Sequence, residues 1–302
     1  MSDLTRNAET RTLDRPTDRP TDRPLRVLVA CEESQRVCIA FRERGHEAYS
    51  CDIIECSGGH PEWHIKGDVI SVINGFCTFI TQDGKIHSMN GPWDLIIAHP
   101  PCTFLTVTGN RHFNTERYGK KAEGRWRNRV DAAVFFMRMV AADCKHIAIE
   151  NPIGIMNTSY RKPDQIIHPW MFPLSEEDKT EKNTCLWLKG LPKLKPWVSE
   201  KPEIAYKSWV DQNGRHKRQT QWYYQTRCLG PKERAMAASK TFLGIAKAMA
   251  EQFGSYIMDG KNDMNQEKQI TLWDWSPEDC PNQETGDCDP EFDLSKHMNP
   301  PE

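Results

Sequence analysis

The sequence predicts an α/β fold with a doubly wound, mainly parallel sheet (a Rossmann-like arrangement). Apolar, β-branched runs alternate with amphipathic helical stretches along the chain, and its ordered part opens with strand, helix and strand. The second of these strands ends on an acid, Asp52. Ligands of such sheets lie beyond the carboxyl ends of the strands. Candidate functional residues are therefore expected where strands end.

Each element is predicted from a local pattern. Short apolar runs predict core strands at 25–30, 46–53, 93–98, 146–151 and 184–191, and the run 66–73 follows the second of them. An Asp-Gly pair between two apolar runs predicts a hairpin insertion over 76–90. Amphipathic spacing predicts helices over 36–45, 127–143 and 233–254. Ser34 is the expected cap of the first helix, and Gly45 and Gly254 are the expected ends of the first and last.

Composition divides the chain into three parts. The stretch 1–24 carries the repeat DRPTDRPTDRP, which has almost nothing to bury and predicts a disordered lead-in. The stretch 255–302 has 12 acidic residues against 3 basic ones and predicts a disordered tail. Because the whole chain has a net charge of −2, the body at 25–254 is basic. A basic body suits a polyanionic partner.

The same composition argues against several classes of protein. No 18-residue apolar run and no signal-peptide pattern occurs, so we expect neither membrane insertion nor secretion. The 11 cysteines include no Cys-x-x-Cys pair, so no zinc site and no other metal site is expected. They are interpreted as reduced thiols of a cytoplasmic protein.

Two strand ends present the candidate reactive residues. "IIAHPPCTFLT" (96–106) ends a strand in two prolines, which donate no ladder hydrogen bond, and then presents Cys102. Glu150-Asn151-Pro152 ends the next core strand, and one crossover helix between the two strands permits them to be neighbours. A thiolate that adds to a ring carbon, with an acid at the ring nitrogen, suits attack on C6 of cytosine.

On these motifs the sequence resembles the cytosine-C5 DNA methyltransferase superfamily, in particular its small phage-encoded branch. The resemblance rests on PPC at 100–102 within "DLIIAHPPCTFL", ENP at 150–152, "KNTCLWLKGLP" at 182–192 and "SKTFLGIAKAMAEQ" at 239–252. It covers about 25–254. It implies a methyltransferase fold with S-adenosylmethionine as cofactor and duplex DNA with a flipped cytosine as substrate.

The resemblance also implies a set of site residues. Cys102 would be the nucleophile, in a catalytic motif that includes Pro101, with Glu150 at the N3 side of cytosine and Asn151 supporting the loop. The cofactor residues would be Cys31, Glu32, Glu33 and Ser34 around the methionine part, Asp52 at the ribose, Asp68 at the adenine, and His99. For His99 an ordinary polar role at the base of the loop is the alternative.

The sequence departs from the family pattern at several positions. The family's first loop is rich in glycine, whereas residues 30–34 read Ala-Cys-Glu-Glu-Ser. Thr103 stands where Gln is common, and Lys182 and Thr184 stand where a Gln-x-Arg-x-Arg stretch is expected. Which arginine replaces that stretch is left open. The target-recognition region is reduced to roughly 190–232, which predicts short or relaxed sequence specificity.

Two basic, partly aromatic stretches, 117–129 and 207–227, are the candidates for DNA contact, because cations bind phosphates and aromatic rings stack on exposed bases. The expected nucleic-acid contacts are Arg111, Arg125, Arg127, Arg215, Lys217, Arg218 and Arg227. In the row Trp222, Tyr223 and Tyr224, at least one ring is expected to be buried. A base in a duplex must leave the stack before a thiol reaches it.

The expected function is therefore transfer of a methyl group to C5 of cytosine in DNA by a monomer. Three alternatives stay open: an amino-group methyltransferase acting on N4 or N6, a methyltransferase of RNA or free nucleotides, and a non-catalytic DNA-binding relative.

Overall fold

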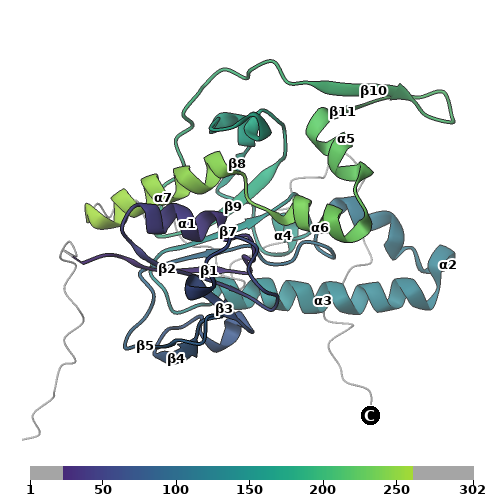
Figure 1. Cartoon of the computed structure of the whole chain (residues 1–302). Coiled ribbons are helices and arrows are strands. Elements are labelled where there is room, and N and C mark those ends of the chain that lie inside the picture. Colours follow the sequence, from purple (N-terminus) through teal and green to yellow (C-terminus); the bar gives the residue numbers. More distant parts are fainter. Residues whose placement is uncertain (1–22, 261–302) are drawn as a thin grey trace, which may run out of the picture.

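A seven-stranded sheet forms the centre of the structure, a computed structural model that describes residues 23–260 (Figure 1). Its strand order is β3-β2-β1-β6-β7-β9-β8. The strands are β1 Arg26–Ala30, β2 Glu47–Asp52, β3 His64–Lys66, β6 Leu95–Ala98, β7 Ile147–Asn151, β8 Gln165–Ile167 and β9 Thr184–Lys189. The first five in that order are parallel, whereas β9 runs antiparallel to both β7 and β8. The predicted α/β fold with a mainly parallel sheet is confirmed.

The central strands are apolar along their whole length because both faces of the sheet are covered. In β1, Leu28 and Ala30 belong to one core, whereas Val27 and Val29 belong to the core on the opposite face. The first core includes Phe136 of α3 (Lys120–Val140). The second core is closed by α1 (Arg36–Glu43) and α7 (Leu243–Met258), which lie side by side in Figure 1.

The strand order changes direction between β1 and β6. Consecutive strands are added on one side of β1 up to β3, and the chain then returns to place β6 and β7 on its other side. Such a switch point opens a crevice at the carboxyl ends of the strands. The strands that lead to Cys102 and Glu150 were predicted to be neighbours. This is confirmed, because β6 and β7 pair in parallel with Ala98 opposite Ile149.

Two hairpins lie outside the central sheet. The predicted insertion at 76–90 is confirmed as the antiparallel pair β4 (Cys77–Ile80) and β5 (Ile86–Met89). Within 190–232 the chain forms a second hairpin, β10 (Tyr206–Val210) and β11 (His216–Thr220), followed directly by α5 (Gln221–Cys228). Figure 1 shows this hairpin extending away from the sheet.

Short elements complete the described part of the chain. They are the helices α2 Thr115–Tyr118, α4 Met156–Ser159 and α6 Pro231–Ser239, and the 3-10 turns η1 Pro61–Trp63, η2 Val69–Ser71, η3 Val107–Phe113, η4 Pro169–Met171 and η5 Glu176–Asp178. The predicted tails at 1–24 and 255–302 fall largely outside the described residues.

Several predicted boundaries were wrong for local reasons. The strand pairing at 66–73 stops at Lys66, where Asp68 caps a 3-10 turn by accepting a hydrogen bond from Ile70 N. The long helix begins at Lys120 rather than at 127. The stretch 233–254 contains two helices, and the second passes through Gly254 to Met258 because Ile257 and Met258 still pack on the core.

The start of α1 also differs from the prediction. Ser34 does not cap it; instead the Glu32 carboxylate accepts hydrogen bonds from Val37 N at 2.7 Å and Cys38 N at 3.1 Å. Gln35, at the cap position, has a left-handed backbone with φ 58° and makes no side-chain cap. A glutamate is long enough to reach the first turn from a position that the usual cap rule does not consider.

The capping role of Glu32 can be tested by stability measurements. Glu32→Ala leaves two buried amides without an acceptor, so we expect the free energy of unfolding to fall by about 1–2 kcal/mol in urea titrations. Ser34→Ala serves as the control and is expected to change it by less than about 0.5 kcal/mol. Equal losses in the two variants would contradict this assignment.

Candidate functional site

Cys102 lies in a tight loop at the carboxyl end of β6. The loop is fixed to the sheet because His99 N donates to Ala30 O of β1 at 2.9 Å. After the two prolines, Cys102 O accepts hydrogen bonds from Leu105 N and Thr106 N, each at 3.0 Å. The Cys102 side chain is partly exposed.

Backbone and amide hydrogen bonds join this loop to the one that follows β7. The Asn151 side chain is buried, and its Nδ2 donates to Pro100 O at 2.7 Å. Further along, Ile155 N donates to Leu105 O at 2.8 Å, and Thr106 and Gly154 form an antiparallel bridge. A side chain at Gly154 would collide with the Leu105 carbonyl, so the two loops approach each other at a glycine. The two predicted motifs therefore form one structural unit.

The Glu150 carboxyl and the Cys102 thiol lie close enough to interact electrostatically. Burial raises the pKa of the Cys102 thiol, and the negative charge of Glu150 raises it further. The positive charge of Lys182 acts on the same thiol in the opposite direction. A like charge nearby disfavours the ionised form of a group, and an opposite charge favours it. The two effects on Cys102 therefore indicate that a thiol, a carboxylate and an ammonium group lie in the same site.

Glu150 is held by a histidine. Its Oε2 lies 3.2 Å from His99 Nδ1, and the side chains of His99 and Glu150 are only 7% and 15% exposed. Burial is the largest influence and alone would raise the pKa of the Glu150 carboxyl. The hydrogen bond to His99 and the charge of Lys182 outweigh burial, so that the pKa of Glu150 lies below its usual value. Glu150 is therefore an ionised carboxylate in the free protein at neutral pH.

Lys182 reaches the site because β9 runs antiparallel. The amino end of β9 lies beside the carboxyl end of β7, with Cys185 opposite Asn151, so the residues before β9 stand at the same edge as Glu150. Lys182 Nζ also donates to Ala238 O at 2.9 Å, which ties α6 to this corner. The sequence marks Lys182 only as a departure from the family pattern, because the direction of β9 cannot be read from an apolar run.

The loop after β1 holds the predicted cofactor residues. Glu32, Glu33 and Ser34 are buried, and neither oxygen of the Glu33 carboxyl has a hydrogen-bond partner in the described structure. Cys31 has φ 60°, so the chain takes a left-handed turn here without a glycine. A glycine in another loop, Gly58, packs closely against this one: a Cβ at Gly58 would lie 2.7 Å from Ser34 O.

Asp52 and Asp68 flank the same corner. Asp52, at the end of β2, is partly buried, and burial raises the pKa of its carboxyl although Ile54 N donates to it. Asp68 is exposed. Both carboxylates raise the pKa of the Cys31 thiol, after the larger effect of burial, which places all three side chains near one another.

The candidate nucleic-acid contacts divide between two regions. Arg111 and Arg127 are exposed near the segment that follows Cys102, whereas Arg125 is partly buried with its guanidinium 5.1 Å from the ring centres of Phe104 and Phe113. The remaining four, Arg215, Lys217, Arg218 and Arg227, are exposed on the β10–β11 hairpin and α5. Of the aromatic row, Trp222 packs on Phe242 at 5.0 Å, whereas Tyr223 and Tyr224 are exposed.

Arg129 is a positioning residue that the sequence patterns did not single out. It is buried, and it donates through Nε to Phe104 O and through Nη2 to Asn110 Oδ1, each at 2.8 Å. Its guanidinium also lies 3.5 Å from the centre of the Phe113 ring. It thereby holds the segment after Cys102 against α3. An arginine within a basic run gives no sign in the sequence that it points inward.

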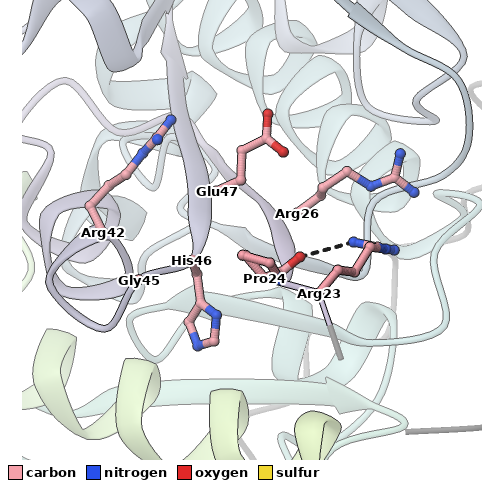
Figure 2. Close-up of a pocket in the computed structure, with 7 residues that line it drawn as sticks. All are labelled: Arg23, Pro24, Arg26, Arg42, Gly45, His46 and Glu47. Carbon is pink, nitrogen blue, oxygen red and sulfur yellow. Dashed lines mark hydrogen bonds between the residues drawn. The ribbon is translucent and has the colours of Figure 1, made fainter. Parts of the chain in front are cut away.

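A separate cavity of about 370 Å³ lies at the opposite, amino-terminal edge of β1 and β2 (Figure 2). Figure 2 shows its labelled side chains fanning apart instead of converging. Its arginines are already engaged: Arg23 forms a salt bridge with Asp94, and Arg42 Nε donates to Ala48 O. This cavity is therefore not part of the Cys102 site.

A scan against protein-family models finds no match to the chain, and a search of curated proteins finds no relative. Within residues 23–260, no helix has the length and apolar character needed to cross a bilayer. The same residues contain no group of three or more His, Cys, Asp or Glu side chains arranged to hold a metal ion.

The electrostatic arrangement predicts how Cys102 reacts. Because Glu150 raises and Lys182 lowers the pKa of the Cys102 thiol, Glu150→Gln should increase its alkylation rate and Lys182→Met should decrease it, each by about threefold or more. The measurement is iodoacetamide labelling at pH 8, followed by peptide mass spectrometry. The exposed Cys228 is the internal reference. Unchanged rates at Cys102 in both variants would contradict the shared site.

Proposed function

We propose that the protein is an S-adenosylmethionine-dependent DNA cytosine-C5 methyltransferase. One observation carries the proposal: Cys102 and Glu150 come from adjacent strand ends whose loops are hydrogen-bonded to each other. A nucleophile and a carboxyl group held together at the carboxyl ends of β6 and β7, beside the switch point of the sheet, suit addition to an electron-poor ring.

The residues of this chain account for the steps at the base. The Cys102 thiolate adds to C6 of cytosine, and the ring electrons displaced by the new S–C6 bond move toward N3, which takes up a proton on the Glu150 side. C5 then becomes nucleophilic and accepts the methyl group. A base removes the C5 proton, N3 returns its proton on the Glu150 side, and the S–C6 bond breaks to regenerate the Cys102 thiolate and neutral 5-methylcytosine.

The β1 and β2 strand ends fit the cofactor chemically. When bound, S-adenosylmethionine supplies a methyl group on a positively charged sulfur. The unpartnered, buried Glu33 carboxylate suits an ammonium group. Asp52 suits sugar hydroxyls, and the neighbouring Ile53, 74% exposed, offers an apolar surface for a flat ring. Asp68, exposed beside this corner, would meet the adenine amino group.

The charge distribution supports DNA as the substrate. The exposed cations of the β10–β11 hairpin and of the segment around Arg111 and Arg127 suit phosphates. A two-stranded ribbon fits a DNA groove, and the exposed rings of Tyr223 and Tyr224 can stack on bases. The base would be extruded from the duplex to meet Cys102.

The activity is tested by transfer of labelled methyl groups to duplex DNA. We expect Cys102→Ser to lower transfer by at least about a thousandfold and Glu150→Gln by about a hundredfold. Cys77→Ser, on the β4–β5 hairpin, is the control and should keep wild-type activity. Nucleoside analysis should identify 5-methylcytosine. No transfer by the wild type, or wild-type activity in Cys102→Ser, would refute the proposal; N4- or N6-methylated bases would favour an amino-group methyltransferase.

The hairpin is tested by the salt dependence of DNA binding. Replacing Arg215, Lys217 and Arg218 by glutamine should weaken binding by about tenfold or more and make the slope of log affinity against log salt shallower by about 2 to 3. Lys85→Gln, an exposed lysine of the β4–β5 hairpin, is the matched control. An unchanged slope in the triple variant would show that the hairpin does not contact phosphates.

A further inference from the structure

His99 is the immediate neighbour of Glu150 across two paired strands. Because Ala98 lies opposite Ile149 in the parallel ladder, the residues that come next, His99 just after β6 and Glu150 within β7, stand at the same level of the sheet. Their side chains meet with Nδ1 of His99 3.2 Å from Oε2 of Glu150. Both side chains are largely buried. The contact is thus set by the register of the sheet.

A second carboxyl group, that of Glu32, lies near enough to the imidazole to interact with it electrostatically. His99 Nε2 is buried and has no hydrogen-bond partner in the described structure. Burial raises the pKa of the nearby Glu32 carboxyl, and the charge of His99 opposes that effect. Glu32 itself is engaged with the start of α1. The titratable groups that interact with the imidazole are therefore Glu150 from β7 and Glu32 from the β1 loop. Cys102 and Lys182 interact in turn with Glu150.

This arrangement meets a requirement of the proposed chemistry. When a thiolate adds at C6, N3 of cytosine needs a proton. Glu150 is an ionised carboxylate, because His99 and Lys182 stabilise its charge, and it therefore has no proton of its own to give. The imidazole of His99, with Nδ1 3.2 Å from Oε2 of that carboxylate, is a neighbouring group that can carry a transferable proton.

We propose that His99 is the proton reservoir of the site, delivering a proton through Glu150 to cytosine N3 while Cys102 adds at C6. This inference rests on the proposed function. His99 starts the step as an imidazolium with a proton on each ring nitrogen. Its Nδ1–H bond breaks as an O–H bond forms on Glu150, which leaves a neutral imidazole protonated at Nε2, and Glu150 passes a proton to N3. When Cys102 is eliminated, the N3–H electron pair returns to the ring and the proton travels back to His99. His99 acts through Glu150 and is a positioning residue.

The test is the pH profile of kcat/KM for methyl transfer in the full chain. His99→Asn keeps an amide donor near the Nδ1 position but cannot release a proton. We expect transfer to fall by about a hundredfold and the decline on the alkaline side of the wild-type profile to disappear. His99→Gln, with its amide nearer the Nε2 position, should lose the Glu150 contact as well. His60→Asn is the matched control, because His60 also pairs with a carboxylate, Glu62 at 3.0 Å, but at the surface.

A second measurement does not depend on activity. In carbon-13 spectra of labelled histidine followed against pH, the His99 signals should differ between Glu150→Gln and the wild type, whereas the His60 signals should not. Wild-type activity and pH profile in His99→Asn would overturn the inference and leave the proposed function standing. If the wild type transfers no methyl group, the proposed function fails, and the inference that rests on it falls with it. A His99 titration unaffected by Glu150→Gln overturns the inference independently of activity.

Discussion

The arrangement of the candidate site depends on the joint between the loops that follow β6 and β7. Two consecutive prolines end β6, and the Pro100 carbonyl, which would otherwise be an unmatched acceptor, is satisfied by the buried Asn151 amide. The bridge between Thr106 and Gly154 closes the same joint from the other side. A thiol and a carboxylate are thereby held by backbone hydrogen bonds and strand register rather than by flexible side chains, which is the precision that a two-residue reaction needs.

Around this joint the charges oppose one another in a partly desolvated space. Burial disfavours the Cys102 thiolate, Glu150 disfavours it further, and Lys182 compensates in part. The same Lys182, with His99, keeps Glu150 ionised. Interactions between charges are stronger when water is excluded, so a change in the protonation of one of these groups is felt by the others. This coupling is the physical basis for assigning His99 and Glu150 to one proton path.

The loop that follows β1 shows how a segment without glycine can adopt the left-handed turns that glycine usually provides. Cys31 and Gln35 adopt left-handed conformations, at a cost of about 1 kcal/mol or more each for residues with a side chain. The buried hydrogen bonds of Glu32 to α1 stabilise this loop. In the described structure, the Glu33 side chain in the loop after β1 is left buried without a hydrogen-bond partner, which is unfavourable unless a cationic group binds there.

The sequence by itself determined the α/β class, the adjacency of the two motif-bearing strands and the hairpin at 76–90, because apolar periodicity, prolines and turn residues act locally. It also indicated the pairing of Cys102 with Glu150, which follows from parallel order. Only the tertiary structure decided that Glu32 caps α1, that Arg129 points inward, and that Lys182 and His99 stand at Glu150. Apart from the Glu32 cap, which a glutamate reaches over five and six residues, these contacts join residues far apart in the chain. They depend on strand direction, register and burial, which local residue patterns do not encode.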